Sequence, residues 1–403
     1  MSQPRADICL ICFGWAIADL AMGRNSRPAA GAELQTARLA SLLAASGQRV
    51  SLVVPRPPDE EEPGPEVTPA GVRLIPAYRP LKGIPCLRYF YSTLPGFWSS
   101  LRRADSAVYY LRGASGFVGL AAAFCRRHGR RLIVGVSSDG DVDRRRARQR
   151  LGRRDFALYS WGLRRADAVV VQTRAQQQLL ERDWGREGVL IRSLSELPPR
   201  RSDVPADGVV IWAGRARRVK RPDLFLDLAR RLPGLRFAMA ATEMVGERAL
   251  YRRLVEEARG LPNLTFAGAV PFREIGSWFD RSWLLVNTSD EEGFPNTFLE
   301  AWGRGLPVVA SVDPDRLLSE HGLGYLCRDV NEMVGRIAFL RERPEVCAEI
   351  GARARAYVEA EHSPQRIVAD YRRLLSALRD GRSDQSVGRS ADPRTEGERG
   401  GAP

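Results

Sequence analysis

Two glutamates and two basic residues are the side chains of this sequence whose types and spacing could do chemistry. Glu292 and Glu300 stand eight residues apart in DEEGFPNTFLEAWGRGLPVV, and Arg215 and Lys220 stand five apart in GRARRVKRP. A carboxylate accepts hydrogen bonds from sugar hydroxyls, whereas a guanidinium fork and an ammonium neutralise phosphate oxygens. The pattern indicates a site for a ligand that carries both hydroxyl groups and phosphate.

The residues between the two glutamates predict a helix start that can hold an anion. The run WLLVNTS indicates a strand, and Pro295 suits the first turn of the helix that follows, where its missing N–H needs no partner. We expect Asn296 to cap this helix, which leaves free backbone N–H groups at Asn296 and Thr297. Glu300 would lie about 6 Å further along at about 1.5 Å per residue, a suitable offset for gripping a ribose.

Glu292 stands on the strand side of the turn that Gly293 and Phe294 form, where it can face a second group of hydroxyls. Taken separately, Glu300 is more often a solvated helix residue and Glu292 an ordinary turn carboxylate.

The basic loop follows another strand-like run, VVIWAG. Gly214 allows a tight turn, after which Arg215 and Lys220 can converge on a diphosphate. A basic loop taken alone is usually only solvated. Because the carboxyl ends of parallel strands meet at one sheet edge, this loop and the helix start are expected to face each other. We interpret the two motifs together as a diphosphate clamp.

Together these motifs resemble those of the nucleotide-sugar glycosyltransferases of family 4, which have the GT-B fold. The resemblance rests on the two glutamates followed by GLPVV and on the GRxxxxKRP loop, and it extends to AGAE at 30–33, where the family usually shows GGAE. It covers most of residues 7–378.

The resemblance implies retaining transfer from a nucleoside-diphosphate sugar, with no required metal and no cofactor beyond that donor. Arg215 and Lys220 would neutralise the leaving diphosphate, Glu292 would hold sugar hydroxyls and Glu300 the ribose. Gly31 would let the backbone approach the donor, whose own phosphate oxygen would take the acceptor's proton. The implied catalytic residues are Arg215, Lys220 and Glu292, and the implied donor-binding residues are Gly31, Gly214, Gly293, Phe294, Pro295, Asn296, Thr297 and Glu300.

Two departures from the family pattern leave the sugar open. Where many members carry a His before an Asp in the first domain's cleft loop, this chain has SSDGD at 137–141. Asp139 or Asp141 could contact the acceptor or the sugar, although a loop carboxylate is more often solvated. Where many members have a Gly-rich loop after the last strand-like run, this chain has VDPDR at 312–316.

The elements that must position these residues alternate along the chain. Strand-like runs such as ICLICFG, RVSLVV and SAVYYL alternate with helix-like runs, which predicts parallel sheets covered on both faces. The pattern breaks at 195–208, rich in Pro, Ser, Asp and Arg, and then restarts. We expect two Rossmann-like doubly wound α/β domains around one cleft, residues 1–200 for the acceptor and 201–362 for the donor. A crossover helix at 363–378 would pack back toward the first domain, and a disordered tail would follow at 379–403.

The composition fits a folded protein of about two domains, with 403 residues of which 44% are hydrophobic. The apolar run from Ile8 to Met22 is short for a membrane span and contains Asp19, so we interpret its first half as a buried strand, with a signal peptide as the alternative. Six scattered cysteines and three histidines favour reduced thiols in a cytoplasmic protein and argue against a zinc site.

The net charge of +14 lies almost entirely in the first half. Residues 1–204 carry 32 Lys and Arg against 19 Asp and Glu, and the remainder carries 30 against 29. The run RRRARQRLGRR at 144–154 precedes Tyr159 and Trp161, which we expect to be exposed. Anionic lipid or a lipid-diphosphate-linked saccharide would be attracted there, which favours a peripheral position on the inner membrane face. A solvated helix is the alternative, and no nucleic-acid-binding motif accompanies the charge.

The leading hypothesis is an enzyme that moves a hexose from a UDP- or GDP-sugar to a glycan or lipid-linked acceptor in cell-surface polysaccharide or glycoconjugate synthesis. One alternative is a protein that kept the fold, lost turnover and binds anionic glycan or membrane. Another is an epimerase or phosphorylase on the same fold. The intact set of Arg215, Lys220, Glu292 and Glu300 argues against a decayed enzyme.

Overall fold

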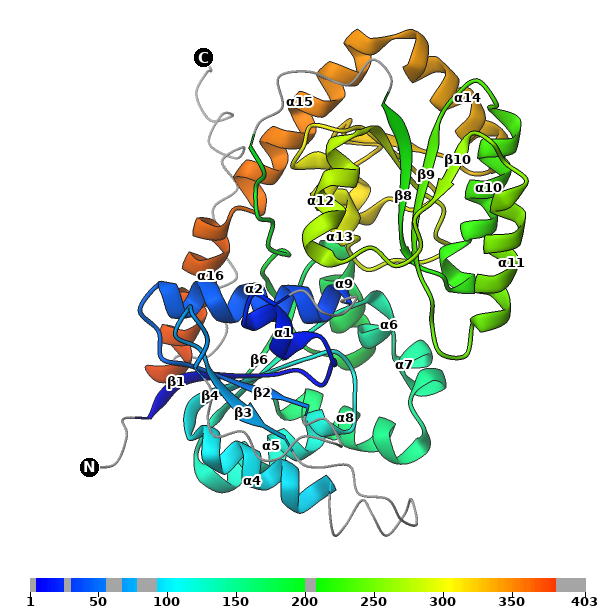
Figure 1. Ribbon diagram of the computed structural model, residues 1–403. Coiled ribbons are helices and arrows are strands. Elements are labelled where there is room, and N and C mark those ends of the chain that lie inside the picture. The colour runs from blue at the N-terminus through cyan, green and yellow to red at the C-terminus, as the bar shows by residue number, and fades with distance from the viewer. Residues whose placement is uncertain (1–4, 25–29, 56–66, 78–92, 200–207, 382–403) are drawn as a thin grey trace, which may run out of the picture.

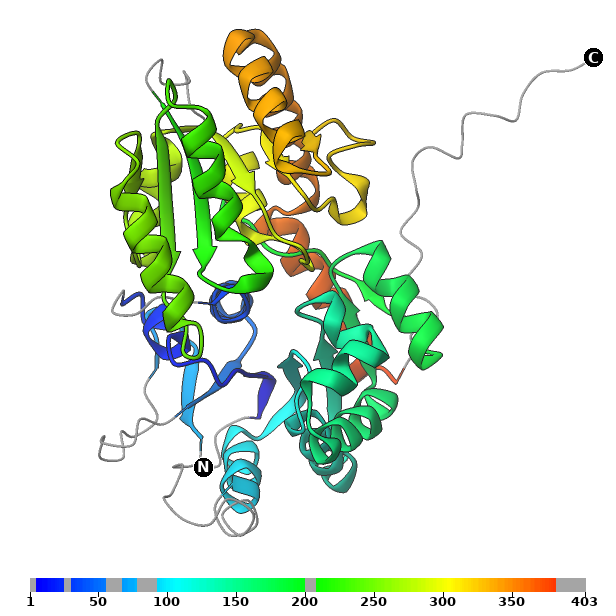
Figure 2. The same cartoon turned by 90° about the vertical axis from the view of Figure 1, so that its right-hand side faces the viewer.

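Two parallel β-sheets, each with helices on both faces, make up the two halves of the protein (Figure 1, Figure 2). The computed structural model describes residues 5–24, 30–55, 67–77, 93–199 and 208–381. Within them the first sheet has seven strands in the order β3-β2-β1-β4-β5-β6-β7, and the second has six in the order β10-β9-β8-β11-β12-β13. The prediction of two tandem Rossmann-like folds is confirmed.

The first half places α4, α5 and α8 on one face of its sheet and α2 on the other. Its strands are almost continuously apolar because both faces are buried. They are β1 Ala6–Ile11, β2 Val50–Val54, β3 Arg73–Pro76, β4 Ser106–Arg112, β5 Arg131–Gly135, β6 Ala168–Val171 and β7 Val189–Leu190. The helices are α1 Ile17–Ala21, α2 Gly31–Ala45, α4 Leu94–Ala104, α5 Phe117–His128, α6 Asp139–Val142, α7 Arg144–Arg150, α8 Arg153–Arg165 and α9 Arg174–Trp184.

The second half repeats this arrangement, with α10, α11 and α14 on one face and α12, α13 and α15 on the other. Its strands are β8 Val209–Arg215, β9 Phe237–Thr242, β10 Leu264–Phe266, β11 Ser282–Asn287, β12 Val308–Ala310 and β13 Gly324–Leu326. The helices are α10 Pro222–Arg231, α11 Arg248–Arg259, α12 Phe272–Asp280, α13 Asn296–Trp302, α14 Val330–Glu342 and α15 Pro344–Glu361, with short 3₁₀ turns η2 Arg218–Lys220 and η3 Pro314–Arg316.

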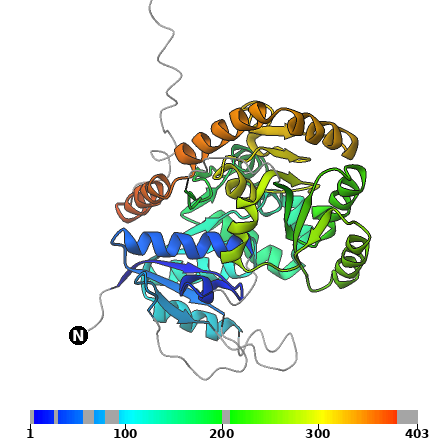
Figure 3. The same ribbon diagram turned by 45° about the horizontal axis from the view of Figure 1, so that its top comes forward.

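The last helix, α16 Pro364–Arg379, returns to the first half and lies beside α2 (Figure 1, Figure 3). Its apolar side chains Ile367, Tyr371 and Leu374 are buried in the core on the α2 face of the first sheet. The expected crossover helix is therefore confirmed. Most of the tail predicted to be disordered lies outside the described residues, from residue 382 onward.

The chain bends between α15 and α16 at His362, which is fully buried. Its Nδ1 donates to the carbonyl oxygen of Ser193 at 2.6 Å, and its own carbonyl oxygen accepts from the backbone N–H of Ser195 at 2.9 Å. Burial lowers the pKa of His362 to about 3, so the ring is neutral at physiological pH. These contacts join the segment that leaves the first half to the segment that returns to it.

Other expectations from composition concern the thiols and the membrane. The apolar run at 8–22 begins with the buried strand β1, as expected. The five cysteines among the described residues have free thiols, while Cys86 lies outside these residues. Of the described helices, none is long and apolar enough to cross a membrane. No group of three or more His, Cys, Asp or Glu side chains within the described ranges is placed to hold a metal ion.

Candidate active site

A cleft of about 970 Å³ lies between the carboxyl ends of the two sheets. This volume is at the upper end of the range of about 300–1,000 Å³ that is usual for ligand sites. The predicted residues that line it are Gly31, Gly214, Arg215, Lys220, Glu292, Gly293, Phe294, Pro295, Asn296, Thr297 and Glu300. The structure brings the implied catalytic and donor-binding residues together, whereas Asp139 and Asp141 are not part of the lining.

Lys220 and Glu292 form an ion pair within this cleft. The Glu292 Oε1 atom also accepts hydrogen bonds from Ser289 Oγ at 2.9 Å and from Asn287 Nδ2 at 3.3 Å. Thr288 Oγ1 donates to the Lys220 carbonyl oxygen at 2.8 Å, which ties the basic loop to the turn after β11. The cation assigned to the diphosphate and the carboxylate assigned to the sugar are therefore in direct contact.

Arg215, the last residue of β8, has no such partner. Its guanidinium forms no hydrogen bond or ion pair with any other described residue, although the side chain is half-buried. Burial, together with the positive charge of Arg217, lowers the pKa of Arg215 below its ordinary value. The carboxylates of Glu33 and Glu292 offset this effect only from a distance. A half-buried cation without an ion-pair partner is unfavourable, and an anionic ligand would relieve that cost.

Glu300 lies on α13 with its side chain 16% exposed, and two arginines hold its carboxylate. Arg304 donates to Oε2 at 2.9 Å, and Arg38 of α2 reaches Oε1 at 3.5 Å and Glu196 at 3.0 Å. Because a carboxylate offers about four acceptor positions, Glu300 keeps capacity for the hydroxyls of a ribose. The contact with Arg38 was missed from the sequence, since no local spacing relates residue 38 to residue 300.

The start of α2 approaches the start of α13 across the cleft. A Cβ at Gly31 would lie 2.4 Å from Asn296 Nδ2, and Gln35 donates to Asn296 Oδ1 at 3.2 Å. Glu33, quoted earlier only as part of AGAE, accepts from the backbone N–H groups of Ala16 at 3.0 Å and Ala30 at 2.5 Å. Because Gly31 has no side chain, the start of α13 can approach the backbone of α2 closely. The hydrogen bonds of Glu33 hold the residues that precede α2 in place.

The expected cap of α13 needs a correction. Asn296 is the first helical residue, and Pro295 occupies the capping position before it without a side-chain hydrogen bond. The reason is that the Asn296 amide is used by Gln35 of the other half rather than by its own helix.

Asp141 and Asp139 both lie on α6, beside the cleft. Asp141 is buried, accepts from the backbone N–H of Ser137 at 2.7 Å and forms an ion pair with Arg150, so it shapes the loop. Asp139 accepts from Gln176 Nε2 at 3.0 Å. Burial, assisted by the nearby negative charge of Glu291, raises the pKa of Asp139 to about 6. Their proposed contact with acceptor or sugar stays a prediction.

The raised pKa of Asp139 predicts a pH-dependent stability. Since the folded protein holds this proton more tightly than the unfolded chain, the site favours folding while protonated, and this contribution is lost as the pH rises from about 4 through about 6. Asp139→Asn should therefore be more stable than the wild type by about 3 kcal/mol at pH 7.5 and nearly equal to it near pH 4. Urea unfolding at both pH values measures the difference, and a variant less stable at pH 7.5 would contradict it.

The basic run at 144–154 only partly matches its expected role. Arg146 and Arg150 of α7 line the cleft, where Arg146 pairs with Glu291 of the second half at 2.8 Å. The expectation that Tyr159 is exposed is wrong: its ring is fully buried, and its hydroxyl donates to the Asp141 carbonyl oxygen at 2.8 Å. Trp161 is partly buried, with the Arg165 guanidinium 4.6 Å from its ring centre.

Comparison with known proteins matches each half of the chain to a family of glycosyltransferases. Residues 30–195 match the family described as "Glycosyl transferase 4-like domain", and residues 207–343 match "Glycosyl transferases group 1". The trehalose synthase of Pyrococcus horikoshii is 30% identical over 128 residues, 31% of this chain and 31% of that protein. This chain spans about a third of the length of the curated relatives that it matches.

Solved structures share the fold over nearly the whole chain. Sucrose-phosphate synthase from Thermosynechococcus elongatus superposes with a TM-score of 0.73 at 21% identity, covering 93% of this chain and 99% of the other. The Anabaena protein HepE, in complex with UDP-glucose, gives a TM-score of 0.69 at 17% identity, with 92% and 99% covered. At these identities the likeness concerns the fold alone.

Proposed function

This chain belongs to the GT-B glycosyltransferases of family 4, and we propose that it is a retaining enzyme that transfers a hexose from a UDP- or GDP-sugar to a glycan or lipid-linked acceptor. The observation that carries the proposal is Arg215, a half-buried cation in the cleft that forms no ion pair with a described residue, while Glu33 and Glu292 act on its charge only from a distance. A diphosphate would supply an ion-pair partner. The HepE structure was solved with UDP-glucose, which makes a uridine nucleotide the first donor to test.

The proposed reaction breaks the bond between the sugar's anomeric carbon and the diphosphate oxygen, and forms a bond from the same carbon to an acceptor oxygen on the same face. The acceptor's proton passes to the departing diphosphate oxygen. Arg215 and Lys220 stabilise the charge that develops on the diphosphate. None of the described residues lining the cleft is a histidine, which is consistent with a base supplied by the donor itself.

The remaining contacts would orient the donor. Glu292 would hold sugar hydroxyls through the carboxylate that it now shares with Lys220, and Glu300 would hold the ribose. The backbone N–H groups of Asn296 and Thr297 would face the phosphates. Holding both ends of the donor would fix the anomeric carbon where the acceptor oxygen can reach it from the same face, and such positioning accounts for a large part of enzymatic rate enhancement.

The proposal extends to the setting of the reaction. Residues 1–204 carry most of the net positive charge, which supports association with an anionic membrane surface on the cytoplasmic side. Such association would weaken as salt screens the charge. Synthesis of a cell-surface polysaccharide or glycoconjugate fits a protein placed there.

The donor site is tested by binding before turnover. UDP or GDP, added at about 100 times its dissociation constant, should raise the apparent stability by about 2.7 kcal/mol through mass action, measured by thermal shift and isothermal titration. Glu300→Ala should weaken this binding, because the ribose loses its acceptor. Arg328→Ala is the matched surface control, since the Arg328 side chain is 91% exposed and pairs only with Glu332.

Two results would contradict the donor assignment. One is that neither nucleotide binds the wild type, and the other is that Glu300→Ala binds UDP and GDP as tightly as the control does. Transfer or hydrolysis from a panel of sugar nucleotides then separates an active enzyme from a protein that only binds.

A further inference from the structure

The basic residues that line the cleft differ in whether the protein already neutralises them. Arg146, Arg150 and Lys220 each pair with a carboxylate. Among the described residues, three lining arginines have no ion-pair partner: Arg112, Arg215 and Arg217. Arg215 ends β8 and Arg217 lies in the loop that follows, where the donor diphosphate is proposed to bind. Arg112 comes from the other sheet and needs a separate explanation.

Arg112 occupies the position in the first sheet where open α/β folds bind ligands. It is the last residue of β4, which lies between β1 and β5. The helix after β1 covers one face of the sheet and the helix after β4 covers the other, so the chain leaves a crevice between these two strand ends. Arg112 therefore stands at the topological switch point of the acceptor half.

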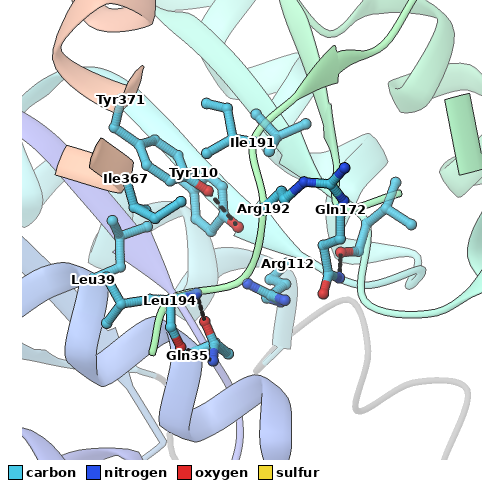
Figure 4. A pocket seen from close by; sticks show the side chains of 12 residues that line it. Gln35, Leu39, Tyr110, Arg112, Gln172, Ile191, Arg192, Leu194, Ile367 and Tyr371 are labelled. Atoms are coloured by element: carbon cyan, nitrogen blue, oxygen red, sulfur yellow. Dashed lines mark hydrogen bonds between the residues drawn. The ribbon is translucent and has the colours of Figure 1, made fainter. Parts of the chain in front are cut away.

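The side chains around Arg112 do not satisfy its guanidinium (Figure 4). Its Nε atom is enclosed and has no partner, and no nitrogen of the group forms a hydrogen bond with a described residue. The amide oxygen of Gln35 accepts from the backbone N–H of Leu194 at 2.8 Å, and that of Gln172 accepts from Ser193 Oγ at 2.5 Å. None of the described residues that line the small cavity beside Arg112 is acidic.

The small cavity and the cleft lie on two sides of the same side chain, because Arg112 lines both. The cavity, of about 10 Å³, has room for about one water molecule, which could serve Nε but is too small for a larger anion. The two terminal nitrogens of the guanidinium form no hydrogen bond with a described residue, so they remain as donors for a ligand in the cleft that Arg112 lines. Such a planar pair of N–H groups matches two oxygens of a phosphate.

We propose that Arg112 binds a phosphate group of the acceptor, so that this enzyme glycosylates a phosphorylated saccharide. This inference rests on the proposed function, because it takes the donor to occupy the Arg215 side of the cleft. Arg146 and Arg150 add positive charge to the same half of the cleft wall, although each is paired, and this favours an acceptor whose phosphate or diphosphate carries two negative charges. The phosphate belongs either to a free sugar phosphate or to a lipid-diphosphate-linked saccharide.

The test uses inorganic phosphate as the probe, titrated into the full-length protein saturated with UDP so that the donor site is filled. Phosphate should bind the wild type, and Arg112→Gln should weaken that binding at least tenfold while the affinity for UDP stays unchanged. Arg148→Gln, an exposed residue of α7 outside the cleft lining, should bind phosphate as the wild type does. Arg112→Lys keeps the positive charge but lacks the planar pair of N–H donors, so it should bind phosphate with intermediate affinity. This variant takes the place of Arg112→Gln if Arg112→Gln does not fold.

Acceptor assays then identify where the phosphate comes from. Glucose and glucose 6-phosphate form one matched pair, and a polyprenyl-diphosphate-linked saccharide with its delipidated sugar forms the other. In whichever pair serves as acceptor for the wild type, Arg112→Gln should raise the KM of the phosphorylated member at least tenfold and leave kcat nearly unchanged. If only one pair supports transfer, that pair shows whether the phosphate belongs to a free sugar phosphate or to a lipid-linked saccharide.

Three results would overturn the inference. The first is that phosphate does not bind the UDP-saturated wild type. The second is that Arg112→Gln loses affinity for UDP, which would place Arg112 in the donor site. The third is an equal KM effect on phosphorylated and neutral acceptors. Failure of the proposed function looks different, because UDP itself would then not bind.

Discussion

Arg215→Ala is expected to lower kcat for sugar transfer by about 10²–10³-fold, the usual effect of removing one donor that stabilises developing charge. The structure gives the reason. Arg215 ends β8 inside the cleft and forms no ion pair with a described carboxylate, and Glu33 and Glu292 act on it only from a distance, so in the proposed reaction its charge would face the leaving diphosphate. Initial rates at saturating donor and acceptor measure the effect on kcat directly.

A neighbouring arginine provides the control for this experiment. Arg218 lies three residues further along the same loop, its side chain is 87% exposed, and it pairs with Glu247 at 3.6 Å. Arg218→Ala should therefore keep its rate within about twofold. Arg215→Ala should also be at least as stable as the wild type, because it removes an uncompensated charge. Equal losses of rate in both variants would mean that the loop acts only through its overall charge.

Gly293→Ala is expected to lower kcat/KM by about 10²-fold, because it moves the two halves apart at the reacting centre. A Cβ at Gly293 would lie 2.9 Å from the Cα of Ser138 and 3.1 Å from Gln176 Nε2, both in the first half. Since a backbone atom cannot rotate away, the turn or the facing loop must shift. Affinity for UDP, which is proposed to rest on the second half, should change little.

Gly234→Ala is the matched control for this substitution, because a Cβ there meets no atom within 4 Å. It should leave both kcat/KM and nucleotide affinity unchanged. Should Gly293→Ala keep full activity, the approach of Ser138 to the turn would be irrelevant to transfer. Should it lose UDP affinity in proportion to activity, the turn would act on the donor rather than on the fit between the halves.

The part of the site that could be predicted from the sequence is the part that one sheet edge assembles. Arg215 ends β8 and Glu292 follows β11, and these strands are neighbours, so their carboxyl ends must meet. The apolar strand runs and the Gly and Pro residues around them were enough to place both motifs. Lys220 and Glu292 are in contact for the same reason, since they lie in the loops that follow these two neighbouring strands.

Contacts between the two halves could not be predicted in this way. Gln35 with Asn296 and Arg38 with Glu300 join positions about 260 residues apart, and their meeting depends on how two separate sheets face each other. The spacing of apolar residues along the sequence carries no information about how the two sheets are oriented relative to each other. Arg112 was overlooked for a different reason, since a single arginine at the end of a strand has the same local pattern whether it is solvated or faces a cleft.

Elements too short to show a period were also missed. The two residues of β7 and the three of β13 contain no alternation from which a strand could be inferred. Tyr159 was expected to be exposed because it follows a basic run, but α8 packs closely against α5 and carries that residue inward.

The buried junction at His362 has a mechanical consequence. The ring and the carbonyl oxygen of His362 tie the segment that returns to the first half to Ser193 and Ser195, where the chain leaves that half. The two segments that connect the halves are therefore held together at one place. Such a junction would allow the halves to rotate about it while opposing translation of one half past the other. In Figure 1, α7 lies on the opposite side of the molecule from this junction. Rotation about the junction would separate the two halves most at α7. The ion pair between Arg146 and Glu291 would then be among the first contacts to break.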